Sequence, residues 1–179
     1  MPNPNNKQNS MRSLSFLGVL CLCLMSCSRT VYVVRHAEKA ASADSASKMM
    51  TNDPPLSEAG KVRALVLKDE LASKHIGHIY STNTIRTMST AEPLRQAIKI
   101  NVELYSSIDS LVIVIKSGKG NALVVGHSNT VDDIVNKLCG EVKLASDLKD
   151  GEYDNLFLVK IRGRKISFDR RKYGYPSNP

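Results

Sequence analysis

The sequence of 179 residues contains no tryptophan, and only 5% of its residues are aromatic. Proteins that bind nucleic acids usually carry a known binding motif or interleave basic residues with aromatic ones. Neither pattern is present, although the formal charge is +8, so we expect no nucleic acid partner. The positive charge suits an anionic substrate or an anionic membrane surface, and the plainer interpretation is a solvated basic surface.

Long hydrophobic runs are also lacking. The apolar stretch "LSFLGVLCLCLM", residues 14–25, has about the length of a signal-peptide core and is short for a membrane span. The following "LMSC", Leu24 to Cys27, resembles the end of a bacterial lipoprotein signal, in which the cysteine becomes the lipidated first residue. We therefore expect a signal peptide over residues 1–27 and a periplasm-facing protein, lipid-anchored in the bacterial cell envelope. An ordinary cleaved leader or a short membrane anchor is the alternative.

Cysteine is scarce once this leader is set aside. Cys21 and Cys23 would leave with the leader and Cys27 would carry lipid, so Cys139 stands alone. A single cysteine forms no intramolecular disulfide, and the fold therefore does not depend on one. The neighbours of Cys139 indicate an apolar helix face, which predicts a buried structural thiol.

From Thr30 onward, strand-like and helix-like segments alternate. We expect strands at 30–34, 78–82, 100–104 and 121–127, helices from 58, at 84–98, 107–118 and 129–140, and a hairpin of 155–161 with 165–171. This order predicts one α/β domain over residues 28–179. It has three layers, a doubly wound, mostly parallel sheet with right-handed crossovers, and a C-terminal antiparallel hairpin with Gly163 in its turn.

For three of these helices the sequence predicts further details. Ser57 is a plausible N-cap for a helix with an apolar stripe formed by Val62, Leu65, Val66 and Leu71. Pro93 should end or kink the helix at 84–98 unless it lies in a first turn. Residues 107–118 are rich in β-branched residues, but a crossover to the next strand requires a helix there.

Two arginines and two histidines follow the ends of three predicted strands. Arg35 and His36 follow the first strand, Arg86 comes just after the second, and His127 follows the fourth. In an open α/β sheet, ligands bind beyond the carboxyl ends of the strands. We therefore expect these four side chains to meet there, with Glu38 as almost the only other strong functional group.

This set of side chains indicates phosphate chemistry. Two guanidiniums match the oxygens of a multiply charged oxyanion, and "GHSNT" at a helix N-terminus adds backbone N–H groups. A histidine beside a bound phosphoryl group is a credible nucleophile. The sequence has no P-loop and no paired carboxylates near the basic groups, so we expect no metal and no cofactor.

The stretches "VYVVRHAEKA", "LSEAG", "IYSTNTIRTMSTAEPL" and "LVVGHSNT" together resemble the histidine phosphatase superfamily, with its phosphoglycerate mutase-like fold. The resemblance implies that His36 is the phosphorylated nucleophile and that Arg35, Arg86 and His127 form the phosphate pocket. Ala37 replaces the usual glycine of the family motif. The short chain is similar to the small single-domain branch that includes phosphohistidine phosphatases.

The resemblance leaves the catalytic acid open. The family usually places a carboxylate after the third strand or near the first motif, and no residue here matches cleanly. Asp109 and Glu38 are the candidates. If neither acts, the substrate should have a leaving group that needs little protonation, such as a phosphoramidate or an anhydride.

The sequence thus predicts a metal-independent phosphatase that hydrolyses a phosphate ester or phosphoramidate through a phosphohistidine. A small phosphorylated molecule or a phosphoprotein would be the substrate, and the membrane would be a partner through the lipid anchor. A phosphomutase of the same fold is one alternative. A membrane-tethered protein that binds a phosphorylated ligand without turnover is another, although the presence of His36 favours an enzyme.

Overall fold

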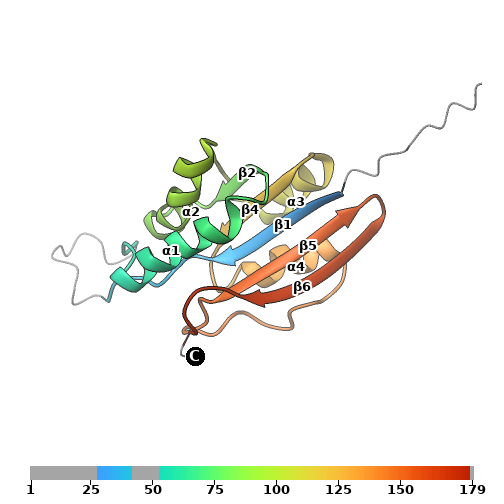
Figure 1. The fold of residues 1–179 in the computed structure, drawn as a ribbon. Coiled ribbons are helices and arrows are strands. Elements are labelled where there is room, and N and C mark those ends of the chain that lie inside the picture. Colours follow the sequence, from blue (N-terminus) through green and yellow to red (C-terminus); the bar gives the residue numbers. More distant parts are fainter. Residues whose placement is uncertain (1–27, 42–52, 178–179) are drawn as a thin grey trace, which may run out of the picture.

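The computed structural model describes residues 28–41 and 53–177, which form a six-stranded sheet with helices on both faces (Figure 1). The predicted signal peptide, including Cys27, lies outside the described residues. The strands are β1 (Ser28–Arg35), β2 (Ile76–Ser81), β3 (Val102–Leu104), β4 (Asn121–Gly126), β5 (Asn155–Arg162) and β6 (Lys165–Lys172). Their order in the sheet is β3-β2-β4-β1-β5-β6.

The first four strands of that order are parallel, and β5 and β6 are antiparallel to their neighbours. The predicted mostly parallel sheet with a terminal hairpin is therefore confirmed. Gly163 adopts a positive φ of 57° in the hairpin turn, a conformation that glycine reaches without steric cost.

Two helices cover each face of the sheet. The helices α1 (Glu58–Leu71) and α2 (Ile85–Ile98) pack on one face, and α3 (Ile108–Ser117) and α4 (Val131–Cys139) pack on the other. Val31 and Val33 of β1 face α3 and α4, whereas Val34 faces α1 and α2. Because β1 is buried on both faces, its apolar run has no polar interruption.

The start of α1 agrees with its expected cap, but the buried face of the helix differs from the prediction. The Ser57 Oγ accepts a hydrogen bond from the Gly60 N–H at 3.1 Å. The predicted apolar stripe is half right: Leu71 is buried and Val66 packs against the core, but Val62 and Leu65 are 44% and 50% exposed. The buried face is formed by Gly60, Arg63, Ala64, Leu67 and Leu71. Arg63 lies on the buried face because its guanidinium binds the Glu38 carboxylate and the Tyr173 carbonyl.

Pro93 neither ends α2 nor lies in its first turn. The helix continues from Ile85 to Ile98 with the half-buried Pro93 inside it. Residues 108–117 form α3, as the crossover requires, and Leu111, Val112 and Ile115 are its buried residues. Their helical spacing outweighs the β-branched composition.

Gly140 ends α4 with a left-handed C-cap (φ 75°). Cys139, the residue before it, is a free thiol that is half-buried rather than fully buried. Burial raises the pKa of this thiol. A thiol that resists ionisation is a poor nucleophile, which agrees with a structural role. Among the described residues, no helix is long and apolar enough to cross a membrane.

Candidate active site

The carboxyl ends of β1, β2 and β4 open into a cavity of about 590 Å³ that brings together the four predicted residues. Arg35 ends β1, His36 follows it, Arg86 lies in the first turn of α2, and His127 follows β4. The cavity is lined by Arg35, His36, Lys39, Ala40, Ala41, Pro54, Arg86, His127, Ser128, Asn129, Thr130 and Asp150.

The backbone around His36 fixes the orientation of its ring. The His36 N–H donates to the Gly126 carbonyl at 2.9 Å, and the Ala37 N–H donates to the Thr90 Oγ1 at 2.9 Å. The His36 Nδ1 lies 2.8 Å from the Ala37 carbonyl oxygen. Because a carbonyl only accepts, Nδ1 carries the proton of the neutral ring, and Nε2 keeps its lone pair.

The environment of His36 keeps that ring neutral. Burial lowers its pKa to about 3, and the charges of Arg35 and Arg86 contribute in the same direction. Only 4% of the residue is exposed. A neutral imidazole with a free lone pair is the form that attacks phosphorus.

His127 lies beside His36 and Arg86. The two imidazole ring centroids are 5.4 Å apart in an edge-on arrangement. The Arg86 Nη2 donates to the His127 Nδ1 at 3.3 Å, so Nε2 carries the proton that faces the Thr82 Oγ1 at 2.9 Å. Burial and the Arg86 charge lower the pKa of His127. Both histidines are therefore neutral near pH 7. The positive charge at the cavity resides on Arg35, Arg86 and Lys39.

Asp53 holds Arg86 from the outer side. Its Oδ1 accepts from the Arg86 Nη1 at 2.9 Å, and its Oδ2 accepts from the Ile85 N–H at 2.8 Å. The carboxylate thus binds both the guanidinium and the N-terminus of α2. This contact orients Arg86 and partly offsets its charge.

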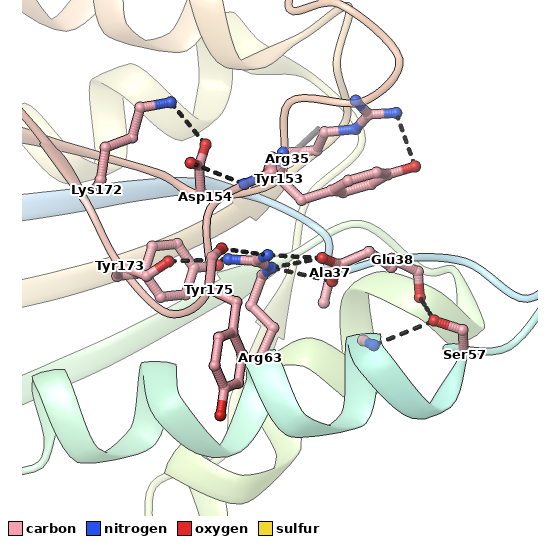
Figure 2. A network of polar contacts seen from close by, with 12 residues as sticks. Arg35, Ala37, Glu38, Ser57, Arg63, Tyr153, Asp154, Lys172, Tyr173 and Tyr175 are labelled. Carbon is pink, nitrogen blue, oxygen red and sulfur yellow. Dashed lines mark hydrogen bonds and ion pairs between the residues drawn. The ribbon is translucent and has the colours of Figure 1, made fainter. Parts of the chain in front are cut away.

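Arg35 is buried beneath the segment that precedes β5. Its Nη1 donates to the carbonyls of Lys149 and Asp150 at 2.8 and 2.9 Å. The guanidinium carbon lies 4.2 Å from the centre of the Tyr153 ring, and Figure 2 shows the two side chains together. Within the described residues, the buried Arg35 Nε has no hydrogen-bond partner. Arg35 therefore organises this segment and retains one free donor.

Glu38 does not face the cavity. Its carboxylate is held by Arg63 of α1, with contacts of 2.8 Å from Nε and 2.7 Å from Nη2 to Oε1 (Figure 2). Its backbone carbonyl packs against Gly60, where an added Cβ would lie 2.2 Å from that oxygen. The sequence "LSEAG" therefore requires its glycine for the close approach of α1 to the loop after His36.

Asp109 is also placed away from the cavity. It lies in the first turn of α3 and pairs with Lys137 of α4 at 2.6 Å. Its side chain is 76% exposed. The one other carboxylate besides Asp53 that we find at the cavity among the described residues is Asp150, whose side chain is 97% exposed and lies 3.6 Å from the Arg35 Nη2.

Sequence reasoning missed Asp53, Asp150 and Tyr153 as parts of the site. β5 is antiparallel to β1, so the residues before β5, among them Asp150 and Tyr153, lie at the end where β1 finishes. The predicted hairpin did not indicate which strand β5 pairs with, so nothing in the sequence pointed directly to these two residues. Asp53 lies in a loop, and no periodicity in the sequence indicates its contact with Arg86.

No group of three or more His, Cys, Asp or Glu side chains suited to a metal ion occurs in the part of the chain that the structure describes. The polar groups at the cavity instead match a tetrahedral oxyanion. Arg35 and Arg86 provide donors, and Ser128 and Asn129 line the wall beside His127.

Comparison with known families agrees with this geometry. Residues 31–110 match the sequence model of the histidine phosphatase superfamily (branch 1). The match runs from β1 into α3 and includes Arg35, His36 and Arg86, while His127 lies beyond it. The resemblance to this superfamily is thus confirmed over that stretch. No curated protein matches the chain.

Solved structures share the fold at low sequence identity. The protein histidine phosphatase SixA, complexed with tungstate, has a TM-score of 0.61 at 18% identity, with 80% of this chain and 96% of that chain covered. A mycobacterial glucosyl-3-phosphoglycerate phosphatase has a TM-score of 0.60 at 12% identity, covering 81% and 98%. Phosphoglycerate mutase from Bacillus anthracis has a TM-score of 0.56 at 15% identity, covering 80% and 92%. The fold is therefore phosphoglycerate mutase-like.

Proposed function

We propose that this protein is a metal-independent phosphatase that forms a phosphohistidine on His36. The observation that carries the proposal is the contact between the His36 Nδ1 and the Ala37 carbonyl, which leaves Nε2 as the nucleophilic nitrogen at an arginine-lined cavity. In the first step, Nε2 bonds to phosphorus and the bond from phosphorus to the leaving group breaks. In the second step, water attacks phosphorus, the N–P bond breaks, and phosphate is released with return of the imidazole lone pair.

Each cationic or neutral group around His36 has a role in this scheme. Arg35 and Arg86 bind the oxygens on which negative charge accumulates, and preorganised donors of this kind favour the transition state. His127 is neutral, and it donates to a phosphoryl oxygen only in the tautomer with the proton on Nδ1, in which the Thr82 hydroxyl donates to Nε2 and the Arg86 guanidinium binds the substrate instead.

The surroundings of the cavity favour a substrate with a good leaving group. Glu38 and Asp109 have other partners, and Asp150 is almost fully exposed. Among the residues that the structure describes, no positioned general acid, which contributes about 10²–10⁴-fold for a poor leaving group, is therefore built into the site. We infer a phosphoramidate such as phosphohistidine, or an anhydride, as the substrate class, with SixA as the neighbour whose name matches it.

The test is to trap the phosphorylated protein. A labelled phosphoramidate should place phosphate on His36 in a form stable to alkali and labile to acid, and turnover should persist in excess EDTA. His36→Ala should remove both label and turnover. Label on Ser128, or activity lost to EDTA and restored by a metal ion, would contradict the scheme. Transfer of the label to a second phosphorylated metabolite instead of water would identify a phosphomutase.

We also propose that Cys27 is lipidated and anchors the protein in the cell envelope. The sequence "LMSC" at the end of an apolar stretch supports the proposal. Intact mass of the membrane-extracted protein tests it. An N-terminus without lipid, or an unchanged distribution of Cys27→Ser, would refute it.

A further inference from the structure

The edge of the sheet opposite the active-site cavity is strongly basic. β1 begins there at Ser28, whose partner in the sheet is Arg162 of β5. Figure 1 shows the start of β1, the turn between β5 and β6, and the end of α3 at one end of the molecule, with the arrowhead of β1 at the other. We call this surface the basic edge and define it by six exposed residues: Lys74, Lys116, Lys119, Arg162, Arg164 and Lys165.

Hydrogen bonds join two of the connections that carry these residues to β1, and the pairing of Ser28 with Arg162 places the third, the turn between β5 and β6, beside the start of β1. Arg29 of β1 donates to the Gly118 and Lys116 carbonyls at 2.6 and 2.5 Å, which ties the connection between α3 and β4 to β1. Asn121 accepts from the Thr30 N–H at 2.7 Å and donates to the Lys74 carbonyl at 2.7 Å. The six residues therefore belong to one continuous surface.

The charges of the basic edge are not neutralised within the described chain. None of its six residues forms an ion pair with a described carboxylate. Exposed basic residues on the helices differ, since Lys61 and Arg95 pair with Glu58 and Glu92. The carboxylates at the same end of the molecule include Glu70 and two that are paired: Asp69 with Lys68 and Glu141 with Lys143. Uncompensated positive charge in one place suits an extended anionic surface.

The course of the chain indicates which anionic surface this is. The apolar stretch of residues 14–25 and Cys27 lie immediately before Ser28, the first residue of β1. No linker separates Cys27 from the sheet. Any membrane attachment through this segment must therefore bring the basic edge to the headgroups.

We propose that the basic edge contacts anionic phospholipid headgroups and holds the active-site cavity away from the membrane. β1 has eight residues, and a strand of that length spans about 26 Å at about 3.3 Å per residue. The cavity at its far end therefore meets substrates from the aqueous phase rather than phosphates of the lipid surface. The inference extends the proposed anchoring and does not depend on the catalytic scheme.

The test uses residues 28–179, because this segment contains every strand and helix that the structure describes together with both core layers, and we expect it to fold without the leader. Binding to vesicles containing anionic phosphatidylglycerol is compared with binding to neutral phosphatidylcholine vesicles. Each basic residue near an anionic surface contributes about fivefold in partitioning, so the triple variant Arg162→Gln, Arg164→Gln and Lys165→Gln should bind about a hundredfold more weakly. High salt should abolish binding of the unmodified segment.

A matched triple variant serves as the control. Lys61→Gln, Arg95→Gln and Arg171→Gln remove the same charge from ion-paired residues outside the basic edge and should leave vesicle binding within about threefold. Both triple variants should hydrolyse an activated aryl phosphate normally, and His36→Ala should bind vesicles normally. Equal vesicle binding by the two triple variants would overturn the proposal. Failure of the unmodified segment to bind anionic vesicles would also overturn it, as would binding to a nucleic acid duplex in place of vesicles.

Discussion

Arg63 of α1 holds the carboxylate of Glu38, two residues after the proposed nucleophile, and at the same time binds the chain that follows β6. Its Nη1 donates to the Tyr173 carbonyl at 2.8 Å, and its Nη2 donates to the Tyr175 carbonyl at 2.9 Å. Figure 2 shows the guanidinium between these groups. One buried side chain thus joins the loop after β1, α1 and the C-terminal segment.

The first prediction is that Arg63→Met destabilises the protein strongly. Removing one partner of a buried ion pair leaves the other uncompensated, which costs about 3–5 kcal/mol. Arg63 is 5% exposed and Glu38 22% exposed. The free energy of unfolding from denaturant titration measures the loss. Lys61→Met, on the exposed side of the same helix, should cost less than about 1 kcal/mol; similar losses for both variants would show that the Arg63 contacts do not stabilise the fold.

The second prediction concerns acid stability. His36 has a pKa of about 3 when folded, against 6.5 in an unfolded chain. Between these values the unfolded state binds one more proton, so stability falls by up to about 1.4 kcal/mol per pH unit as pH decreases below 6.5. Unfolding free energies measured across this range should fall less steeply for His36→Gln, which retains only the parallel contribution of His127. Equal slopes for His36→Gln and wild type would contradict the prediction.

The third prediction is that Asp53→Asn tightens the binding of phosphate. The amide oxygen can still accept from the Ile85 N–H, so α2 keeps its position while a negative charge leaves the cavity. Loss of a like charge near a bound anion should lower the inhibition constant of phosphate about fivefold, equivalent to roughly 1 kcal/mol. Asp69→Asn, distant from the cavity and paired with Lys68, should have no effect. Weaker phosphate inhibition in Asp53→Asn would show that orientation of Arg86 outweighs charge.

The fourth prediction separates substrates by leaving group. An activated aryl phosphate and a phosphoramidate should react much faster than an alkyl phosphate, because none of the described carboxylates is held in the cavity as a general acid. Asp109→Asn should leave all rates unchanged, and Glu38→Gln should lower them together by loosening the loop after His36. Steady-state rates on the three substrates decide the matter. A loss above about a hundredfold confined to the alkyl phosphate in Asp150→Asn would identify Asp150 as the acid and contradict the inferred substrate class.

The sequence predicted the framework of the site because strand ends are visible as the ends of apolar runs. Arg35, His36 and His127 follow such runs directly, and parallel strands bring their carboxyl ends to one edge. The face of α1 was predicted only in part, since Val66 and Leu71 face the core but apolar periodicity gave no sign that Arg63 is buried. Its burial depends on Glu38 and on carbonyls about a hundred residues away in the chain. Contacts of that kind are set by tertiary structure and leave no periodic pattern.

The attachment of the segment after β6 has a consequence for how the protein matures. The Tyr153 N–H donates to the Ser177 Oγ, and Arg63 binds the same segment, so the wall of the cavity rests on residues near position 177. Contacts between residues so far apart close large loops and tend to form late in folding. The parallel strands and their helices can assemble before that segment arrives. During refolding, catalytic competence should therefore lag behind recovery of secondary structure, and for a chain that emerges N-terminus first the site is completed only when this segment docks.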